Sequence, residues 1–407
     1  MSITASRRAR RRHGRLAAAA LAAACLFTAS AWAGTQIRAV ETDLASDNER
    51  VISYRHQQHL WLTADGALHL VMNRGHYAPG GLALYSSHDG GISWQLSHAF
   101  AGTDDKSTGD VQPAGDEAHI VYHTAANAVM HEQLRYDAVA RAWTLLASET
   151  AFASGRLAAL NPALAVDEQG GLWVGFLARN KLSNQGQLRV VFRPAGGGWT
   201  DPGLGFGPVD NRAVERSARP VAVPGGIGMV WTVREFTYFS RHALTEAPTT
   251  PWQTETLFVG SVDSTVSDPY ASHFNVVTDA GGGVHLITVE NYDVLHFRWD
   301  PATLAWSGPR LVDDARKVAY AQLGLFDGRP VVGYSVQRGK GSLEVGDALG
   351  ENWDPSYDLA LVPAVPGINY NTARIELPAK ASGTMPVLQQ YDISGVQRLM
   401  LFSVPAP

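Results

Sequence analysis

Arginine, histidine, tyrosine and asparagine recur in this sequence at the ends of short apolar segments, and these side chains can perform chemistry. Histidine and tyrosine can remove a proton and return it. The candidates for this catalytic role are His76, His123, Tyr292 and Tyr370. Arginine can form two parallel hydrogen bonds with a carboxylate. The candidates for substrate binding are Arg55, Asn180, Arg219, Arg234, His273, Asn291 and Arg338.

Other histidines are expected to have structural roles or to face water. His69, His119 and His285 stand at alternating positions of expected second strands and are interpreted as structural. His88 and His296 are expected in solvated outer strands. The sequence contains no HxH or HExxH spacing, and the isolated Asp-Gly turns do not form a calcium loop. The sequence therefore predicts neither a metal site nor a cofactor.

The elements that position the candidate residues come from a repeat of about fifty residues. Turn signals recur at residues 65–66, 115–116, 167–170, 225–226, 279–282 and 327–328. Tryptophans recur in step with these turns, at Trp94, Trp143, Trp199, Trp252, Trp306 and Trp353. The intervals between them are 49, 56, 53, 54 and 47 residues. Each tryptophan is expected to cover the gap between two neighbouring units.

Each unit contains four segments typical of β-strands, and no segment keeps the 3.6-residue period of a helix. In the fifth unit the expected strands are residues 273–278, 284–289, 293–299 and 305–311. The seventh unit has three, at residues 372–377, 385–390 and 397–404. Residues 35–41 form an isolated strand that can pair with residues 397–404 and protect both edges. The sequence predicts an all-β fold, a seven-bladed β-propeller of four-stranded antiparallel blades closed by the N-terminal strand.

Residues 87–94, Ser-His-Asp-Gly-Gly-Ile-Ser-Trp, resemble the Asp box, whose pattern is Ser-x-Asp-x-Gly-x-x-Trp. Residues 347–353 resemble a second copy with one inserted residue. The resemblance to Asp-box (BNR) repeat propellers implies a turn between the third and outer strands. Asp89 would accept hydrogen bonds from turn amides, glycine would supply a positive φ, and Trp94 would pack inward. This role is structural, so Asp89 is not expected to be catalytic.

The resemblance extends to the sialidases. Residues 54–60 resemble their Tyr-Arg-Ile-Pro opening, in which the arginine binds the sugar carboxylate, although His56 and Gln57 replace Ile and Pro. The residues that match the sialidase arginines and tyrosine nucleophile are Arg55, Arg234, Arg338 and Tyr370. However, residues 73–80 contain no acid/base carboxylate, and Arg219 replaces the glutamate that polarises the tyrosine. These two departures argue against sialidase hydrolysis.

In a propeller, the loops that lead into inner strands and leave second strands share one face. In this chain that face is rich in Arg, His, Asn and Tyr and poor in carboxylates. Such residues can hold a uronate carboxylate, remove the C5 proton and protonate the departing glycosidic oxygen. This reaction is the β-elimination of a polysaccharide lyase, and residues 161–167 and 273–277 resemble segments of the propeller ulvan lyases. The alternatives are a sialidase-like glycoside hydrolase and a non-catalytic glycan-binding or interaction propeller.

The N-terminus predicts export. Residues 1–33 contain six arginines, no acid, an apolar run and a small-x-small cleavage site, so we expect a signal peptide followed by one propeller domain at 34–407. The apolar run is too short to span a membrane. We expect a secreted or periplasmic protein exported by the general or the twin-arginine route; Cys25 in a poor lipobox makes a lipoprotein the weaker interpretation.

Cleavage after residue 33 changes the composition of the mature chain. It removes the only cysteine, so no disulfide can form. It also removes six of the 33 Lys and Arg, leaving 27 against 38 Asp and Glu, so the net charge falls from -5 to a formal -11. This acidic body argues against nonspecific nucleic-acid binding. The expected partner of this monomer is an extracellular polysaccharide or glycoconjugate.

Overall fold

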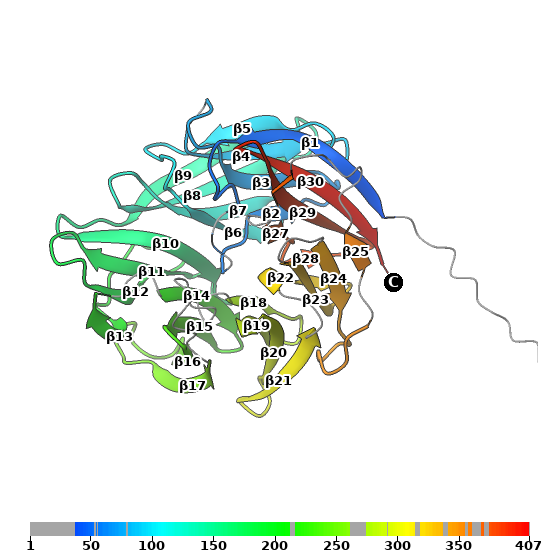
Figure 1. The fold of residues 1–407 in the computed structure, drawn as a ribbon. Helices are drawn as coiled ribbons and strands as arrows, with labels where there is room; N and C mark the ends of the chain where they lie inside the picture. The colour runs from blue at the N-terminus through cyan, green and yellow to red at the C-terminus, as the bar shows by residue number, and fades with distance from the viewer. Residues whose placement is uncertain are drawn as a thin grey trace, which may run out of the picture. The chain divides into compact units, whose positions relative to one another are not determined.

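The computed structural model describes residues 37–52, 54, 56–78, 80–211, 216–260, 274–290, 292–313, 318–336, 341–354, 357–359, 368–369 and 374–406. The described residues contain β-strands and turns but no helix, as the absence of a 3.6-residue period predicts. The strands form seven sheets arranged in a ring (Figure 1). The predicted all-β, seven-bladed propeller is therefore confirmed. No helix in the described part of the chain is long and apolar enough to cross a membrane.

In the first six blades the strands follow one another from the centre outward in chain order. The first blade contains β2 (Leu60–Leu62), β3 (Leu68–Asn73), β4 (Leu82–Ser87) and β5 (Gln95–Ala99). The second blade contains β6 (Gly109–Ala114), β7 (Glu117–His123), β8 (Val129–Asp137) and β9 (Ala142–Phe152). The third and fourth contain β10 (Leu157–Val166), β11 (Leu172–Asn180), β12 (Gly186–Arg193) and β13 (Gly205–Asp210), then β14 (Arg216–Val223), β15 (Gly226–Val233), β16 (Phe236–Ala243) and β17 (Gln253–Val259).

The fifth blade agrees with its predicted strands, with small changes at their ends. It contains β18 (Phe274–Thr278), β19 (Val284–Glu290), β20 (Asp293–Asp300) and β21 (Ala305–Asp313). The sixth contains β22 (Val318–Phe326), β23 (Arg329–Val336), β24 (Gly341–Val345) and β25 (Tyr357–Leu359). The short β28 (Lys380–Ala381) adds a parallel pairing along β22, where Leu325 lies opposite Lys380.

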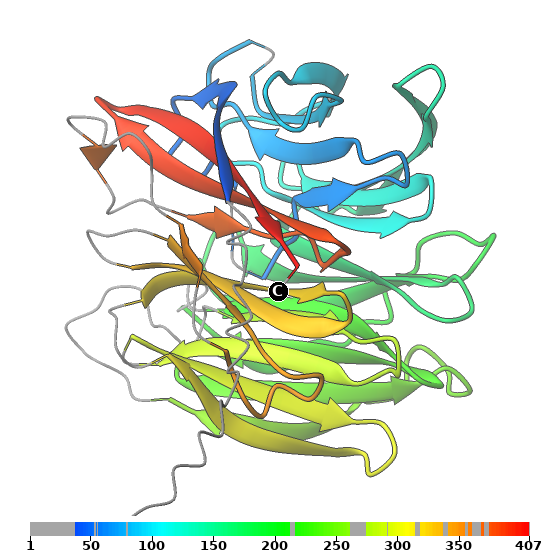
Figure 2. The ribbon, with the colours of Figure 1, turned by 90° about the vertical axis from the view of Figure 1, so that its right-hand side faces the viewer.

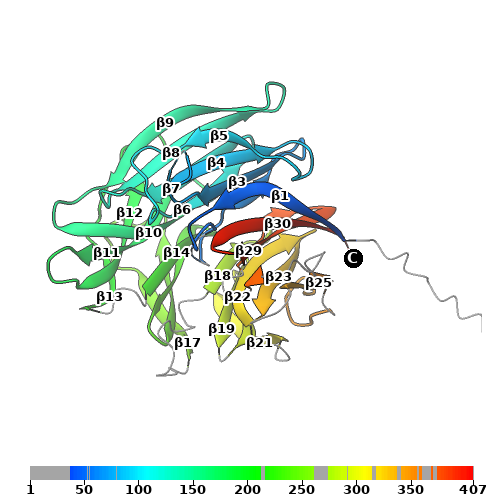
Figure 3. The same ribbon diagram turned by 45° about the horizontal axis from the view of Figure 1, so that its top comes forward.

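The seventh blade joins the two ends of the domain. It contains β1 (Arg38–Ser46), β30 (Val396–Pro405), β29 (Thr384–Ile393), and the short inner strands β26 (Ile368–Asn369) and β27 (Ile375–Glu376). The N-terminal β1 pairs antiparallel with β30, with Glu41 opposite Met400, and the two strands lie side by side in Figures 1, 2 and 3. The predicted closure is confirmed, but the strand begins at Arg38 and continues to Ser46.

The hydrophobic core is divided among the junctions between neighbouring blades. Seven clusters of buried apolar residues each combine side chains from two adjacent blades. Each of the six repeating tryptophans packs in or against a different one; Trp94, for example, packs with Leu388 and Leu401 of the seventh blade. At the junction of the sixth and seventh blades, Ile37 packs just before the outer strand β1 instead. The predicted role of the tryptophans is confirmed.

The centre of the ring is filled by the segment His56–His59, whose four residues are buried. This segment precedes β2 and hydrogen-bonds to several blades, because buried polar groups need partners. The Gln57 amide donates to the carbonyl of Pro162 at 2.7 Å, the Gln58 backbone N–H donates to Asp110 at 2.6 Å, and that of His59 donates to Glu376 at 2.7 Å. The segment that resembles a sialidase opening therefore ties the second, third and seventh blades to the first.

Candidate functional site

The face predicted to bind substrate lies where the inner strands begin and the second strands end. We call it face A; the first residue of β14, Arg216, lies at this side. Face B is the opposite side, where the inner strands end, as β14 does at Val223. Five predicted site residues fall outside the described residues: Arg55, His273, Asn291, Arg338 and Tyr370. The other six are described and are treated in turn.

The two histidine candidates for proton transfer have different surroundings. His76 lies in the loop after β3 with its side chain 79% exposed, and its Nδ1 is 3.3 Å from Asp47 Oδ2. His123 ends β7 and is buried, with Nδ1 3.2 Å from the hydroxyl of Thr108. Burial lowers the pKa of His123 to about 4, so it is neutral at physiological pH. No contact joins the two histidines among the described residues.

Arg234 stands directly after β15, as expected, in the left-handed backbone region with a φ of 55°. Its Nη2 is 3.5 Å from Oδ2 of Asp210, the last residue of β13. The other oxygen of Asp210 pairs with the buried Arg216. The carboxylate of Asp210 was not singled out from the sequence, because it lies in an outer strand, away from the inner-strand positions that were searched. It partly neutralises the predicted sugar-binding arginine.

Asn180 and Tyr292 both stand beside turns on face A. Asn180 ends β11, and its side-chain oxygen accepts hydrogen bonds from the backbone N–H groups of Leu182 and Ser183, at 2.8 and 3.0 Å. This arrangement caps the turn between β11 and β12. Tyr292 lies between β19 and β20 with a φ of 75°, and it is partly buried.

Arg219 is the fourth residue of β14 and lies inside the ring, not at the start of the strand as expected. Its Nη1 donates to the carbonyl oxygen of His56 at 2.5 Å and to Asp110 Oδ1 at 2.7 Å. Asp110 is fully buried and also accepts the backbone N–H groups of Gln58 and Leu164, at 2.6 and 2.7 Å. The pair therefore links the second and fourth blades through the centre.

A cluster on face A combines an arginine with a tyrosine that the sequence did not single out. The guanidinium of Arg374, the residue before β27, lies 5.4 Å from the ring centre of Tyr320 on β22. Nη1 of Arg374 donates to the carbonyl oxygen of Ile52 at 3.4 Å. Two residues further on, the Tyr54 hydroxyl accepts a hydrogen bond from Arg50 at 2.7 Å. We call Arg374 and Tyr320 the face A cluster.

A second feature missed from the sequence is a buried carboxylate in the centre. Glu376 of β27 has its Oε2 3.2 Å from His59 Nδ1 and 3.2 Å from the amide nitrogen of Gln322, and all three residues are buried. The sequence places Glu376 in the expected strand 372–377 but contains no signal that its carboxylate lies at the centre of the ring. No group of three or more His, Cys, Asp or Glu side chains in the described part of the chain is arranged to hold a metal ion.

The turn that resembles an Asp box lies between β4 and β5, on the side of face B. Asp89 Oδ1 accepts the backbone N–H groups of Ile92 and Ser93, both at 3.0 Å. Gly91 has a φ of 88°, and its carbonyl accepts the indole N–H of Trp94 at 3.1 Å. Asp347 and Trp353 repeat these turn contacts in the sixth blade. Asp89 thus has the expected turn-capping contacts.

The histidines expected to be structural are buried in the blade junctions, with one correction. His69 and His285 are fully buried, while His119 is partly buried and stacks on His131. His88 is partly buried in the turn after β4. His296 was expected to be solvated in an outer strand, which is wrong. It lies in the third strand β20 and is buried, because its ring stacks on His285 and contacts Trp353.

No known family model and no curated protein matches the sequence. Among solved structures, an ulvan lyase of a polysaccharide lyase family is similar with a TM-score of 0.50 and 12% identity, over 86% of this chain and 95% of that one. The lectin of Aleuria aurantia bound to α-methyl-L-fucoside is similar with a TM-score of 0.43 and 12% identity, over 74% and 96%. A prolyl endopeptidase has a TM-score of 0.44 and 11% identity over 88% of this chain, which spans 51% of its length.

At 12% identity, the likeness to the ulvan lyase concerns the fold alone. The similarity to the ulvan lyase extends over most of both chains. The chain is a seven-bladed β-propeller, and its fold is similar to that of the ulvan lyase.

Proposed function

We propose that face A binds an acidic, uronate-containing glycan and that the protein cleaves it by β-elimination, as a polysaccharide lyase. The observation that carries this proposal is the contact of Arg374 with Tyr320, 5.4 Å from guanidinium to ring centre, on the face where the inner strands begin. A planar guanidinium can bind a carboxylate through two parallel hydrogen bonds and still stack on an aromatic ring. The ulvan lyase is compatible with the proposal, since it performs such a reaction on a similar fold.

The chemistry requires an anchor for the acid and groups that move a proton. Binding of the uronate carboxylate to an arginine stabilises the charge that develops when the C5 proton leaves. The electrons of the C5–H bond form the C4–C5 double bond, and the C4–O glycosidic bond breaks. A phenol or an imidazole can take the proton, and a second group can protonate the departing oxygen. Arg374 is the proposed anchor and the hydroxyl of Tyr320 a proposed proton-transfer group.

The earlier candidates Arg55, Arg338 and Tyr370 stay predictions, as do His273 and Asn291. Arg234 is retained as a second anchor for a longer glycan, with Asp210 as its competitor for the acid. A non-catalytic glycan-binding propeller is the second candidate function. It is favoured by the surroundings of the two histidine candidates, since His76 is exposed while His123 is buried and neutral. A proton-transfer group must lie within hydrogen-bond reach of the substrate, and a buried His123 does not meet this requirement for a glycan on the surface.

The test uses the chain from residue 34 onward with a panel of uronate-containing and sialylated glycans. Elimination produces an unsaturated uronate that absorbs ultraviolet light together with new reducing ends. Reducing ends without absorbance indicate hydrolysis, which would contradict the lyase. Binding without either product indicates a glycan-binding protein. If no uronate-containing glycan in the panel is bound or cleaved, the proposal is wrong.

Two variants assign the activity to the face A cluster. Arg374→Gln should lower kcat/KM for the acidic glycan by about 10–100-fold, since it removes hydrogen bonds to a charged group. Tyr320→Phe should lower kcat by about 100-fold or more with a small change in KM. Arg135→Gln and Tyr357→Phe are the matched controls, because Arg135 lies on the third strand of the second blade and Tyr357 on the outer strand of the sixth. Melting temperatures must stay close to that of the unmodified protein. Full activity in both cluster variants would contradict the assignment.

We also propose that residues 1–33 direct export and are then removed. The support is their run of arginines, apolar segment and small-x-small site. Mass spectrometry of the protein recovered from the medium or periplasm should find a mature chain that begins at Gly34. A chain that retains Met1 inside the cell would contradict this proposal.

A further inference from the structure

A cavity of about 220 Å³ lies inside the ring toward face B, away from the face A cluster. It is bounded by the later parts of several inner strands, including β10, β14 and β18, and by the short β28. Its apolar wall includes Val166, Pro220 and Val277. The volume is below the 300–1,000 Å³ that is usual for pockets of drug-sized ligands, so it suits a small molecule.

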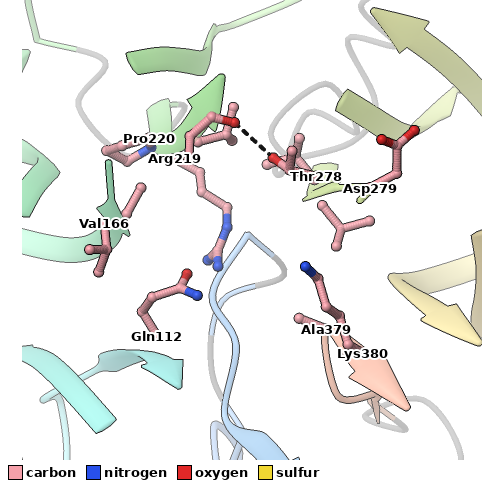
Figure 4. A pocket seen from close by; sticks show the side chains of 13 residues that line it. Gln112, Val166, Arg219, Pro220, Thr278, Asp279, Ala379 and Lys380 are labelled. Carbon is pink, nitrogen blue, oxygen red and sulfur yellow. Dashed lines mark hydrogen bonds between the residues drawn. The ribbon is translucent and has the colours of Figure 1, made fainter. Parts of the chain in front are cut away.

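Three nitrogen-bearing side chains point into this cavity from different blades. Figure 4 shows the guanidinium of Arg219, the amide of Gln112 and the ammonium of Lys380 turned toward the same space. Thr278 is turned away, because its hydroxyl donates to the carbonyl oxygen of Ala222 at 3.0 Å, the dashed line in Figure 4. Apart from the carboxylate of Asp279, the polar side chains that face the cavity are therefore hydrogen-bond donors, and two of them are positively charged.

The guanidinium of Arg219 has N–H groups that no described residue accepts. Its Nη1 makes the two hydrogen bonds to His56 and Asp110, while no hydrogen bond to a described residue uses Nη2 or Nε. The side chain is only 5% exposed, so the position of the guanidinium is held by the protein. A guanidinium edge with two N–H donors matches the two oxygens of a carboxylate.

The two carboxylates near the cavity, those of Asp279 and Asp110, already interact with other groups of the protein. Asp279 accepts the backbone N–H groups of Gly281 and Gly283, both at 2.8 Å, and its other oxygen lies 3.4 Å from Arg298. Asp110 neutralises the positive charge of Arg219 through its ion pair with Nη1. Lys380, on the exposed side of the cavity, then provides a positive charge that has no acidic partner among the described residues.

We propose that this cavity is a second binding site, which takes a small organic carboxylate. The carboxylate would accept hydrogen bonds from Nη2 and Nε of Arg219 and from the ammonium of Lys380, with the amide of Gln112 as an additional donor. Its carbon skeleton would lie against Val166 and Pro220. The site is separate from the glycan site proposed on face A and does not depend on it.

The test measures binding of sodium D-glucuronate by isothermal titration calorimetry, with D-glucose as the neutral counterpart of similar size. The chain from residue 34 should bind glucuronate, more weakly at higher salt, and should not bind glucose at the same concentration. Lys380→Gln should weaken binding about tenfold, since a hydrogen bond to a charged group is lost. Lys106→Gln, an exposed lysine in the loop after β5, is the matched control and should leave binding unchanged.

Arg219→Lys provides an independent variant, because it keeps a positive charge beside Asp110 but removes the two free donors. It should also weaken binding about tenfold or more, with the folded state checked by the melting temperature. Arg374→Gln removes the proposed anchor on face A, so the titrations of the Lys380 and Arg219 variants are repeated in this background, where the remaining glucuronate binding belongs to the cavity. Equal binding of glucose, or unchanged binding in both Lys380→Gln and Arg219→Lys, would overturn the proposal. Loss of all glucuronate binding in Arg374→Gln would place glucuronate on face A only and overturn the proposal as well.

Discussion

Arg219 donates a hydrogen bond to Asp110 through the centre of the propeller, with Nη1 2.7 Å from Oδ1, although the two residues belong to the fourth and second blades. The segment His56–His59 of the first blade closes around this pair, since the Arg219 guanidinium also binds the carbonyl of His56 and the Asp110 carboxylate also binds the N–H of Gln58. The contact thus stabilises three blades at once. Loss of this contact should therefore lower the stability of the whole ring.

Asp110→Asn should therefore lower the free energy of unfolding by about 3–5 kcal/mol, because it leaves a buried guanidinium without its counter-charge. Urea unfolding at neutral pH, followed by tryptophan fluorescence, measures the change. The control is Glu117→Gln, which breaks an exposed pair with Arg135 and should cost no more than about 1 kcal/mol. Equal losses in the two variants would mean that the central pair does not hold the blades together.

Deletion of residues 34–46 should cause aggregation, because it removes β1 and exposes the edge of β30. Light scattering and size-exclusion chromatography compare this chain with one that begins at Gly34. The chain that begins at Gly34 keeps the complete seventh blade and should remain a single species. A deleted chain that stays dispersed and melts at the same temperature would contradict the proposed role of the closure.

The buried histidines predict a loss of stability in acid. Burial lowers the pKa of His69, His131 and His296 to about 3 from the usual 6.5. At pH values between about 3 and 6.5, the unfolded chain therefore binds more protons than the folded one. Their contribution is therefore unaffected above pH 6.5 and becomes unfavourable as the pH falls from 6.5 toward 3, by up to about 1.4 kcal/mol per pH unit for each histidine.

Urea midpoints measured from pH 7.5 to pH 5 should fall with pH, and the fall should be smaller in His296→Gln. His76→Gln, which removes an exposed histidine instead of a buried one, is the matched control variant. A pH dependence that is identical in the unmodified protein and in His296→Gln would show that this histidine is not buried as a neutral group.

Asp89→Ala should lower the free energy of unfolding by about 1–2 kcal/mol and leave the activity of the folded protein unchanged. The hydrogen bonds from Ser93, and weaker ones from Ser87 and Ile92, hold the pKa of Asp89 at about 2. Its contribution is present above its usual pKa of 3.8 and is lost as the pH falls toward 2. Thermal unfolding and a glycan assay check both parts. Loss of activity at an unchanged melting temperature would mean that Asp89 acts in the reaction.

The sequence by itself determined the architecture. Turns and tryptophans that kept their phase over six units predicted the blades, and the unpaired segment before the first unit predicted the closure. The blades and the closure could be predicted because each blade packs against its neighbour in the same way. The same strands, tight turns and large side chain therefore recur in each unit of the sequence. Strand ends differed by a few residues, as at Arg38 and Ser46, since pairing with β30 extends β1 beyond its apolar pattern.

The arrangement of the candidate residues was decided by the tertiary structure. The sequence placed Arg219 at a strand start and His296 in a solvated strand, and the ring buried both, one against Asp110 and the other against His285. It did not mark Arg374 and Tyr320, which come from different blades and meet only when the ring closes. Whether a polar side chain faces water, a counter-charge or a cavity depends on partners that lie up to hundreds of residues away. The packing of the blades decides which partners meet, and short-range sequence patterns do not predict it.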